Sequence, residues 1–346
     1  MTPSTLHPHV TAPVLVYGAY GHTGRFVVDS LLAVGLRPIL AGRNGDKLRD
    51  LGARYPELSI REVGLDRPAP LVAALSEAGA VINCAGPFLD TAAPLIEAAL
   101  QAGIHYVDTA AEQESVRRTL TDYATPAQHE GVVILPAMAF FGGLADLLAT
   151  AAAGDWVETD SIAVGIALDG WHPTEGTRRT GRRNHYPRRI FVGGQLVPLE
   201  DTVAARSWDF AAPWGSEPVR EFPLAEVILL SAHLQTGEIR TYLNQVPLRD
   251  LHDATLPPPT ATDRLGRSGQ QFRMEVEVRL GNEVRRRHYA GRDIYAFTAP
   301  LAVEAVRRLL RGAYRRPGAV APGEVFPADD FLGALAAYPL LSGPVA

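Results

Sequence analysis

Short apolar segments alternate with amphipathic segments through the first 135 residues of the chain. Val14–Tyr17 is a β-branched apolar run short enough for a buried strand, and apolar residues recur at helical spacing after it. The same alternation predicts further strands at 38–41, 59–63, 80–88 (running into a tight turn), 104–108 and 132–135, and helices at 47–55, 71–78, 91–102 and 112–130. This regularity predicts a doubly wound parallel sheet, the Rossmann arrangement, with right-handed crossovers.

The pattern changes to period two in the second half of the chain. Between Phe272 and Leu280 every second residue is apolar, and Gly281 and Asn282 turn the chain into a returning strand near 284–289. A sheet with one buried face and one wet face has this alternation, so we predict an antiparallel sheet. The remaining patterns predict strands at 161–167, 190–192, 227–233 and 240–243, a helix at 298–311 and a long loop at 250–270.

A glycine-rich turn joins the first predicted strand to the first helix. Its glycines are Gly18, Gly21 and Gly24. The first permits a sharp turn, the second lets a pyrophosphate approach the backbone, and the third permits close packing of helix on strand. Because a strand precedes the turn and a helix and second strand follow it, we interpret it as a dinucleotide site. A glycine turn that binds nothing is the alternative.

The end of the second strand distinguishes the two nicotinamide cofactors. NAD sites usually place a carboxylate there, to accept hydrogen bonds from the ribose 2′-hydroxyl. This chain has Arg43 and Asn44 instead, with Lys47 one turn later. A cationic fork suits a 2′-phosphate, so we predict NADP(H). Asp66 ends the third strand, where adenine contacts often fall in this fold.

Composition and charge exclude several classes of function. The net charge of −5 disfavours general nucleic-acid binding, and no apolar run approaches the roughly 20 residues of a membrane span. With Cys84 as its single cysteine and no metal-ligand spacing among its ten histidines, the chain is predicted to hold no metal. Lys47 is the only lysine, which excludes a Tyr-x-x-x-Lys pair. We expect a cytoplasmic protein, because the N-terminus lacks the layout of a signal peptide.

Three segments resemble one family. YGAYGHTGR with AGRN, VINCAGPF with AGIHYVDTAAE, and ILPAMAFFGGLADLLA occur in the order and spacing of the saccharopine dehydrogenase-like (saccharopine reductase-like) NADP-binding oxidoreductases. The resemblance is strong over Val14–Asp146 and continues, more weakly, to about Leu335. It implies a Rossmann domain and a C-terminal α+β domain whose antiparallel sheet covers the cleft and often helps dimerisation. It implies cofactor contacts at Gly18, Tyr20, Gly21, His22, Thr23, Gly24, Arg43, Cys84, Ala85, Gly86 and Pro87.

We therefore predict a Rossmann NADP-binding domain over residues 1–145 and an α+β substrate and dimerisation domain over 146–297. For the C-terminal helices, at about 298–346, packing against the first domain is an alternative. Asn44, Lys47, Asp66, Phe88 and Asp108 complete the predicted cofactor set. Asp108 has two readings, since it could instead cap the following helix.

The candidates for catalysis and substrate binding follow the predicted strand at 132–135. His172, His185 and Tyr186 lie on a basic segment where the family places substrate contacts, so each is a candidate proton donor; a surface or structural role is the alternative. Phe140 and Phe141 predict an apolar wall near the nicotinamide. The six-arginine run from Arg178 to Arg189 is either a solvated face or a dock for an anionic substrate or an acidic carrier protein.

These observations favour an NADPH-dependent reductase, acting as a homodimer on a C=N, C=C or C=O bond of a small metabolite. Imine reduction is slightly preferred, because hydride addition to an iminium needs no protein acid. The alternative is a non-catalytic NADP-binding sensor or partner protein.

Overall fold

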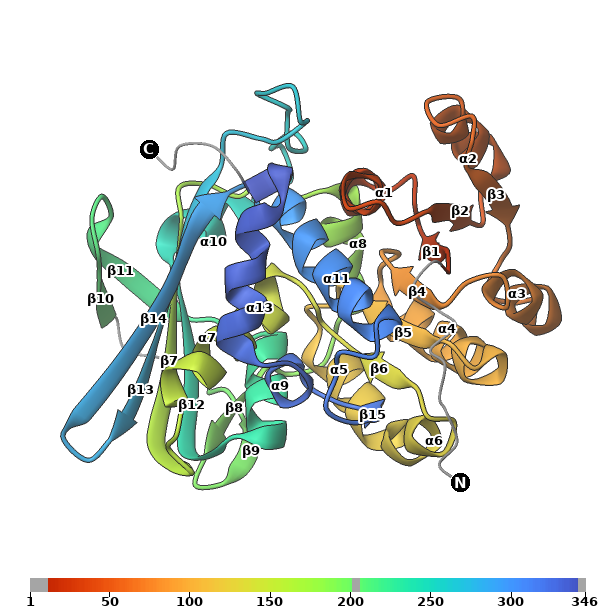
Figure 1. The fold of residues 1–346 in the computed structure, drawn as a ribbon. Coiled ribbons are helices and arrows are strands. Elements are labelled where there is room, and N and C mark those ends of the chain that lie inside the picture. The colour runs from red at the N-terminus through yellow and green to blue at the C-terminus, as the bar shows by residue number, and fades with distance from the viewer. Residues whose placement is uncertain (1–11, 201–205, 342–346) are drawn as a thin grey trace.

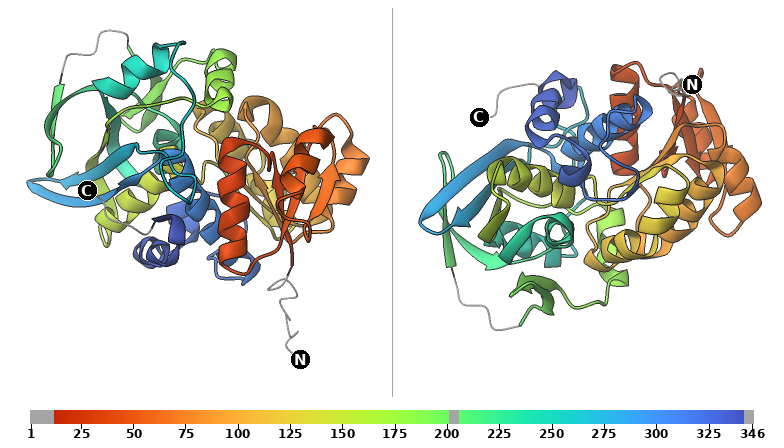
Figure 2. Two further views of the ribbon diagram at one scale, coloured as in Figure 1. Left: turned by 90° about the horizontal axis from the view of Figure 1, so that it is seen from above. Right: turned by 60° about the horizontal axis from the view of Figure 1, so that its bottom comes forward.

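The computed structural model describes residues 12–200 and 206–341 (Figures 1 and 2). The predicted first domain begins at residue 1 and the predicted C-terminal helices end at residue 346, but residues 1–11 and 342–346 lie outside the described residues. The molecule contains two sheets. One includes β1–β6, the other includes the long β13–β14 hairpin, and α11 lies between the two sheets (Figure 1).

The first sheet has seven strands, all parallel, in the order β15-β6-β5-β4-β1-β2-β3. Its strands are β1 (Val14–Tyr17), β2 (Pro38–Gly42), β3 (Ser59–Glu62), β4 (Ala80–Asn83), β5 (His105–Asp108), β6 (Val133–Leu135) and β15 (Gly318–Ala319). This sheet confirms the predicted doubly wound arrangement.

Alternate residues of these strands enter two different cores. In β1, Val14 and Val16 face one core, which also receives α1 and the helices of the second half, while Leu15 and Tyr17 face the core under α3 and α4. All four residues are at most 3% exposed. Burial on both faces explains why β1 is a continuous apolar run rather than an alternating one.

The C-terminal part of the chain returns to the first sheet. Strand β15 pairs with β6, and α11 packs on α1. Leu301, Ala305 and Leu309 of α11 are nearly fully buried in the larger core. The first sheet is therefore completed by residues that follow the second sheet in sequence.

The second sheet is mixed. Its strand order is β10-β11-β12-β7-β13-β14, and β8 joins it through β12 and pairs with β9. All pairings are antiparallel except β12 with β7, which is parallel. The strands are β7 (Glu158–Leu168), β8 (Arg189–Val192), β9 (Gln195–Pro198), β10 (Arg206–Phe210), β11 (Gly215–Glu221), β12 (Gln235–Asn244), β13 (Gln271–Leu280) and β14 (Glu283–Arg292).

Thirteen α-helices are described within residues 12–200 and 206–341. They are α1 (His22–Ala33), α2 (Gly45–Gly52), α3 (Pro68–Leu75), α4 (Phe88–Ala102), α5 (Gln113–Asp122), α6 (Ala124–His129), α7 (Ala145–Ala153), α8 (Glu175–Arg183), α9 (Ala225–His233), α10 (Gln245–His252), α11 (Ile294–Leu310), α12 (Pro322–Val325) and α13 (Ala328–Ala334). None of these helices is long and apolar enough to cross a bilayer.

A buried ion pair joins three of these helices. Nε2 of His233, at the end of α9, lies 2.7 Å from Oδ1 of Asp146 on α7. Oδ2 of Asp146 accepts the N–H of Gly323 on α12 at 2.5 Å. Burial lowers the pKa of His233, but the adjacent Asp146 carboxylate outweighs burial and raises the pKa above its usual value.

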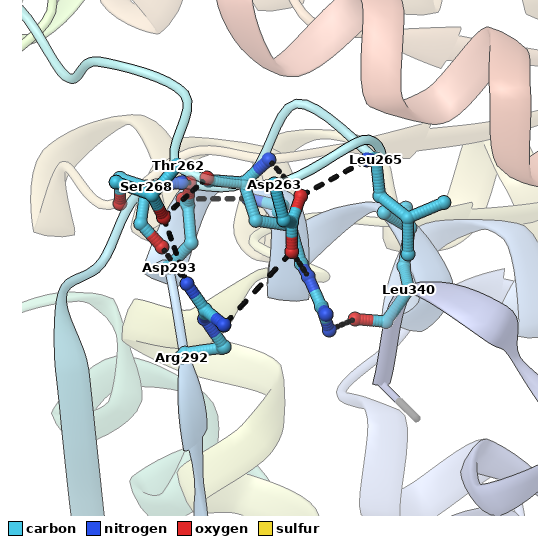
Figure 3. Close-up of polar contacts among 9 residues, drawn as sticks. Thr262, Asp263, Leu265, Ser268, Arg292, Asp293 and Leu340 are labelled. Atoms are coloured by element: carbon cyan, nitrogen blue, oxygen red, sulfur yellow. Dashed lines mark hydrogen bonds and ion pairs between the residues drawn. The ribbon is translucent and has the colours of Figure 1, made fainter. Parts of the chain in front are cut away.

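Polar contacts hold the segment between α10 and β13. Oδ1 of Asp263 accepts the backbone N–H groups of Leu265 and Arg267, and Oδ2 accepts Nε of Arg267 at 2.7 Å (Figure 3). Asp293, fully buried, caps α11 through Oδ1 and accepts the N–H of Ser268 through Oδ2 at 2.6 Å. The segment is therefore fixed to the start of α11.

Several sequence predictions of local structure are wrong. The apolar run at 227–233 is not a strand but most of α9, because its residues face the two cores on either side of the helix. The predicted helix at 112–130 divides at Tyr123 into α5 and α6. The first residues of the predicted loop at 250–270 belong to α10, and the basic segment after β7 contains α8.

Candidate active site

The glycine turn brings backbone, rather than side chains, to the end of β1. Gly18 has φ +80°, and a Cβ there would lie 3.0 Å from the Cβ of Ala85. A Cβ on Gly24 would lie 2.3 Å from the carbonyl oxygen of Gly18, so this position cannot carry a side chain without moving the turn. Helix α1 begins at His22, and no side chain caps it. The turn therefore leaves helix N–H groups for an anion.

Two cations stand beyond the end of β2. Arg43 directly follows the strand and Lys47 lies on α2, with its Nζ 5.9 Å from the ring centroid of Tyr20. Both line one cavity with the glycine turn. Asn44 does not line it: its side chain caps α2 by accepting the N–H of Lys47 at 3.0 Å. Asn44 is therefore a helix cap, whereas the two cations line the cavity.

The loop after β4 forms the next part of the cavity wall. Asn83 fixes this loop by accepting the N–H of Ala85 at 3.0 Å through Oδ1. Burial raises the pKa of the Cys84 thiol far above its usual value, which supports a packing role. The predicted cofactor residues that line the cavity are Gly18, Tyr20, Gly21, His22, Thr23, Arg43, Lys47, Asp66, Cys84, Ala85, Gly86, Pro87 and Phe88.

The cavity has a volume of about 1160 Å³ and runs from these residues to an aromatic end. Phe141 stacks on Trp171 with ring centroids 5.1 Å apart, and Phe140 lines the same end. The indole N–H of Trp171 donates to the hydroxyl of Tyr295 at 2.9 Å. The apolar wall predicted from the two phenylalanines is thus extended by the second half of the chain.

Asp108 does not reach the cavity. It is fully buried, and its Oδ1 accepts the N–H groups of Ala110 at 3.0 Å and Ala137 at 2.7 Å. Its Oδ2 accepts the hydroxyl of Tyr106 at 2.9 Å. Asp108 therefore fixes the loops after β5 and β6, and it does not cap α5, whose N-cap residue is Glu112.

Glu112 is a cavity residue that the sequence reasoning missed. It lines the cavity, yet it is only 3% exposed. Its Oε1 accepts the N–H of Phe88 at 2.9 Å, and Oε2 accepts the N–H of Ala111 at 3.1 Å. Burial raises the pKa of Glu112 to about 7, against the lowering effect of these hydrogen bonds. The position of Glu112, four residues after a predicted strand end, was the signal that could have found it.

Helix α8 covers part of the cavity. A Cβ on Gly86 would lie 2.8 Å from Oγ1 of Thr180, so α8 closely approaches the loop after β4. The hydroxyl of Thr177 also lies 2.9 Å from that of Tyr295. Arg178 itself is turned away, because its guanidinium donates to the carbonyls of Asp253 at 3.0 Å and Leu256 at 3.1 Å. Arg178 does not line the cavity.

The three predicted proton donors also lie outside the cavity lining. His172 is exposed and its Nδ1 lies 3.1 Å from the carbonyl oxygen of Pro257. His185 is exposed, and Tyr186, at 43% exposure, accepts a hydrogen bond from Arg118. The structure therefore does not bring these three side chains to the aromatic end. Among the described residues, no group of three or more histidine, cysteine or acidic side chains is arranged to hold a metal ion.

Comparison with known proteins identifies the N-terminal domain. Residues 14–135 match the family described as the saccharopine dehydrogenase NADP-binding domain. A lipid droplet localized protein of Caenorhabditis elegans is 30% identical over 148 residues, 39% of this chain and 34% of that protein. A saccharopine dehydrogenase-like oxidoreductase of Bos taurus is 29% identical over 153 residues, 39% of this chain and 35% of that protein. The chain thus spans about a third of the length of these relatives.

A solved structure extends the similarity of fold to the second half. Apo saccharopine dehydrogenase (L-Glu forming) from Saccharomyces cerevisiae superposes with a TM-score of 0.66 over 94% of this chain and 97% of that chain, at 12% identity. At this identity the match describes the fold alone. The Gly18–Gly24 turn and the Arg43–Lys47 cations fit the same assignment. Residues 14–135 are therefore similar to the saccharopine dehydrogenase NADP-binding domain, and the cofactor is NADP(H), as the sequence resemblance predicted.

Proposed function

We propose that this chain is an NADPH-dependent oxidoreductase that reduces a small metabolite at the aromatic end of its cavity. The observation that carries the proposal is the continuity of one cavity from Arg43 and Lys47, past the glycine turn, to Phe141 and Trp171. A pure nucleotide-binding module needs only the first part of this cavity. The second part is built by residues of both halves of the chain, and it offers room for an acceptor beside the nicotinamide.

The residues of the chain have separable roles in this reaction. NADPH, when bound, supplies the hydride. Arg43 and Lys47 would hold the 2′-phosphate, and the N–H groups of the glycine turn would hold the pyrophosphate. Phe140, Phe141 and Trp171 would exclude water from the reacting atoms.

We also propose Glu112 as the group that manages the proton. It is the carboxyl group that lies almost fully buried in the cavity wall near Phe88, and a pKa of about 7 allows it to be a proton donor at neutral pH. An acid is needed for a ketone or an enoyl group, but not for an iminium. The presence of Glu112 therefore weakens the reason for preferring imine reduction, and the three bond types become comparable candidates.

The sensor alternative remains a proposal, and so do the predicted cellular location and oligomeric state of the protein. A sensor would need no aromatic end beyond the nucleotide. The C. elegans relative is named for lipid droplets, so our prediction of a cytoplasmic protein is not the only location to test. Homodimer formation and a carrier-bound substrate also stay as predictions.

Hydride transfer from labelled cofactor tests the proposal. NADPH deuterated at C4 is incubated with the protein and a panel of ketones, enoyl compounds and aldehyde–amine mixtures, and products are analysed by mass spectrometry. We expect a deuterated product with one acceptor class, and none with a Gly21→Val variant. Tight NADPH binding with no deuterium transfer to any acceptor would favour the sensor.

A further inference from the structure

Six basic side chains line the cavity, and their ion pairs divide them into two groups. Arg179 and Arg182 pair with Glu175 of their own helix, at 3.9 and 3.2 Å, and Arg183 pairs with Asp90 at 2.8 Å. The other three cavity-lining cations have no carboxylate partner within 4 Å among the described residues; they are Arg43, Lys47 and Arg188.

The three unpaired cations lie in two different places. Arg43 and Lys47 are adjacent, at the end of β2 and on α2, where a 2′-phosphate would neutralise both. Arg188 comes from the opposite half of the chain, just before β8, and its guanidinium carbon lies 3.6 Å from the ring centroid of Phe222. Phe222 and Leu224 line the cavity with it. One cation therefore remains after the cofactor phosphate has been accounted for.

The backbone around Arg188 is fixed. The side-chain amide of Gln113 accepts the N–H of Arg189 at 2.7 Å and donates to its carbonyl at 2.8 Å. The same amide donates to the carbonyl of Leu224 at 3.0 Å. Gln113 directly follows Glu112, so the residue after Arg188 is tied to the residue after the buried carboxyl group.

The surroundings leave the guanidinium charged and open to a ligand on one side. Phe222 occupies one face of its plane, so the N–H edge remains for hydrogen bonds. Burial lowers the pKa of Arg188 to about 10, partly offset by the attraction of buried Glu226, so it stays protonated at neutral pH. Glu226 is fully buried and does not line the cavity, and it forms no ion pair with Arg188 among the described residues. Arg188 is an exposed residue whose guanidinium packs on Phe222, and a charged guanidinium with a free edge favours a planar or tetrahedral oxyanion.

We propose that Arg188 binds an anionic group of the substrate, a carboxylate or a phosphate, and so holds the substrate against the aromatic end of the cavity. The inference rests on the proposed function, because it supposes an acceptor bound beside the cofactor. It replaces Arg178, the arginine predicted from the sequence, whose guanidinium is engaged by backbone carbonyls. It also narrows the substrate to one that carries a negative charge.

Three probes with the same ring test the proposal without any turnover. Benzoate, phenyl phosphate and neutral benzamide are titrated into the full-length protein saturated with NADPH, and binding is followed by the change in NADPH fluorescence and by calorimetry. We expect one or both anions to bind at least tenfold more tightly than benzamide. Comparing the affinities for benzoate and phenyl phosphate identifies which oxyanion the site prefers.

Two neighbouring variants locate the site. Arg188→Met should weaken the preferred anion at least tenfold, leave benzamide unchanged and leave the NADPH affinity unchanged. Arg189→Met is the matched control, because the side chain of Arg189 does not line the cavity and its contacts with Gln113 use backbone atoms. This variant should bind the anion as tightly as the unmodified protein. Arg188→Lys should recover part of the affinity, since it keeps the charge and loses the fork.

The results separate failure of this inference from failure of the proposed function. Equal anion binding by the unmodified protein and by Arg188→Met would overturn the inference, as would no preference over benzamide. Weaker NADPH binding in Arg188→Met would overturn it too, by making Arg188 a cofactor contact. If Arg188→Met loses anion binding but the unmodified protein transfers hydride to no acceptor, the anion site would be upheld and the reductase function rejected.

Discussion

Nη2 of Arg183 lies 2.8 Å from Oδ1 of Asp90, and this ion pair joins two residues that line the cavity from different halves of the chain. Arg183 ends α8, in the second half of the chain, whereas Asp90 lies in the first turn of α4, directly after the loop that lines the cofactor end. A carboxylate in this turn also interacts favourably with the positive end of the helix. The pair therefore holds the arginine-rich helix over the cavity.

Removing this pair should speed the escape of the cofactor more than it destabilises the fold. Both side chains are about half exposed, so the pair contributes at most about 1 kcal/mol to stability. We expect Arg183→Met to raise the NADPH dissociation rate several-fold in stopped-flow fluorescence. Arg182→Met is the control, since Arg182 pairs with Glu175 of its own helix and with no other acidic residue that the structure describes. Equal rates in the two variants would show that α8 does not retain the cofactor.

Arg43→Ala should discriminate between the two nicotinamide cofactors. Losing a charge-assisted contact to the 2′-phosphate should weaken NADPH by about 2 kcal/mol and leave NADH almost unchanged. Fluorescence titration with both cofactors measures this. Arg49→Ala provides a control on α2, because Arg49 pairs with Asp46 and does not line the cavity. The same loss for NADPH and NADH would contradict the assignment.

The glycines of the turn should fail in different ways. A Cβ at Gly24 would meet the Gly18 carbonyl oxygen at 2.3 Å, whereas a Cβ at Gly21 would meet it at 3.1 Å. Gly24→Ala should therefore lower the melting temperature. Gly21→Val should mainly block the pyrophosphate and abolish NADPH binding with a nearly normal melting curve. Unchanged NADPH affinity in Gly21→Val would move the nucleotide away from this turn.

Glu112 should give the activity its pH dependence if a ketone or enoyl group is reduced. The protonated carboxyl is the donor, so the rate should be full below the pKa of about 7 and fall above it. Glu112→Gln should reduce turnover about 10²–10⁴-fold and remove this pH dependence while NADPH still binds. Glu114→Gln is the control, because arginines lower the pKa of Glu114 to about 2. An unaltered profile in Glu112→Gln would point to iminium reduction or another donor.

The His233–Asp146 pair should stabilise the protein most at low pH. Because the folded-state pKa of His233 is raised above its usual 6.5, the ionic contribution is complete below about pH 6.5 and is lost as pH rises through the folded-state value. His233→Asn should cost about 3 kcal/mol at pH 6, since it leaves a buried carboxylate poorly paired, and less at pH 9. Chemical denaturation at both pH values measures this. The opposite pH trend would contradict a charged His233.

The parts of the site that lie on the Rossmann half could be predicted from the sequence, because local chemistry determines them. Gly18, Gly21 and Gly24 act through backbone geometry within one turn, and Arg43 follows a strand directly. The carboxyl ends of parallel strands meet at one edge of the sheet, so these residues share a cavity whatever the rest of the chain does.

The aromatic end could not be predicted in the same way. Arg188 and Trp171 reach the cavity through packing of the second sheet against the first, and neither has a local motif. Arg178 and Arg188 lie in the same arginine-rich run, but the Arg178 guanidinium donates to backbone carbonyls, whereas Arg188 lines the cavity. The apolar run of α9 is similarly ambiguous, since four to eight buried residues fit either a strand or one to two turns of a helix between two cores.

The return of β15 to the first sheet affects the order in which this protein can fold on the ribosome. Strand β15 is synthesised about 180 residues after β6, which at about 5–20 residues per second is a delay of about 10 to 35 seconds. During that time β6 is an unpaired strand edge, and α1 lacks α11 as its packing partner. The nascent nucleotide-binding half therefore depends on late residues for protection, which makes this edge the expected site of chaperone binding during synthesis.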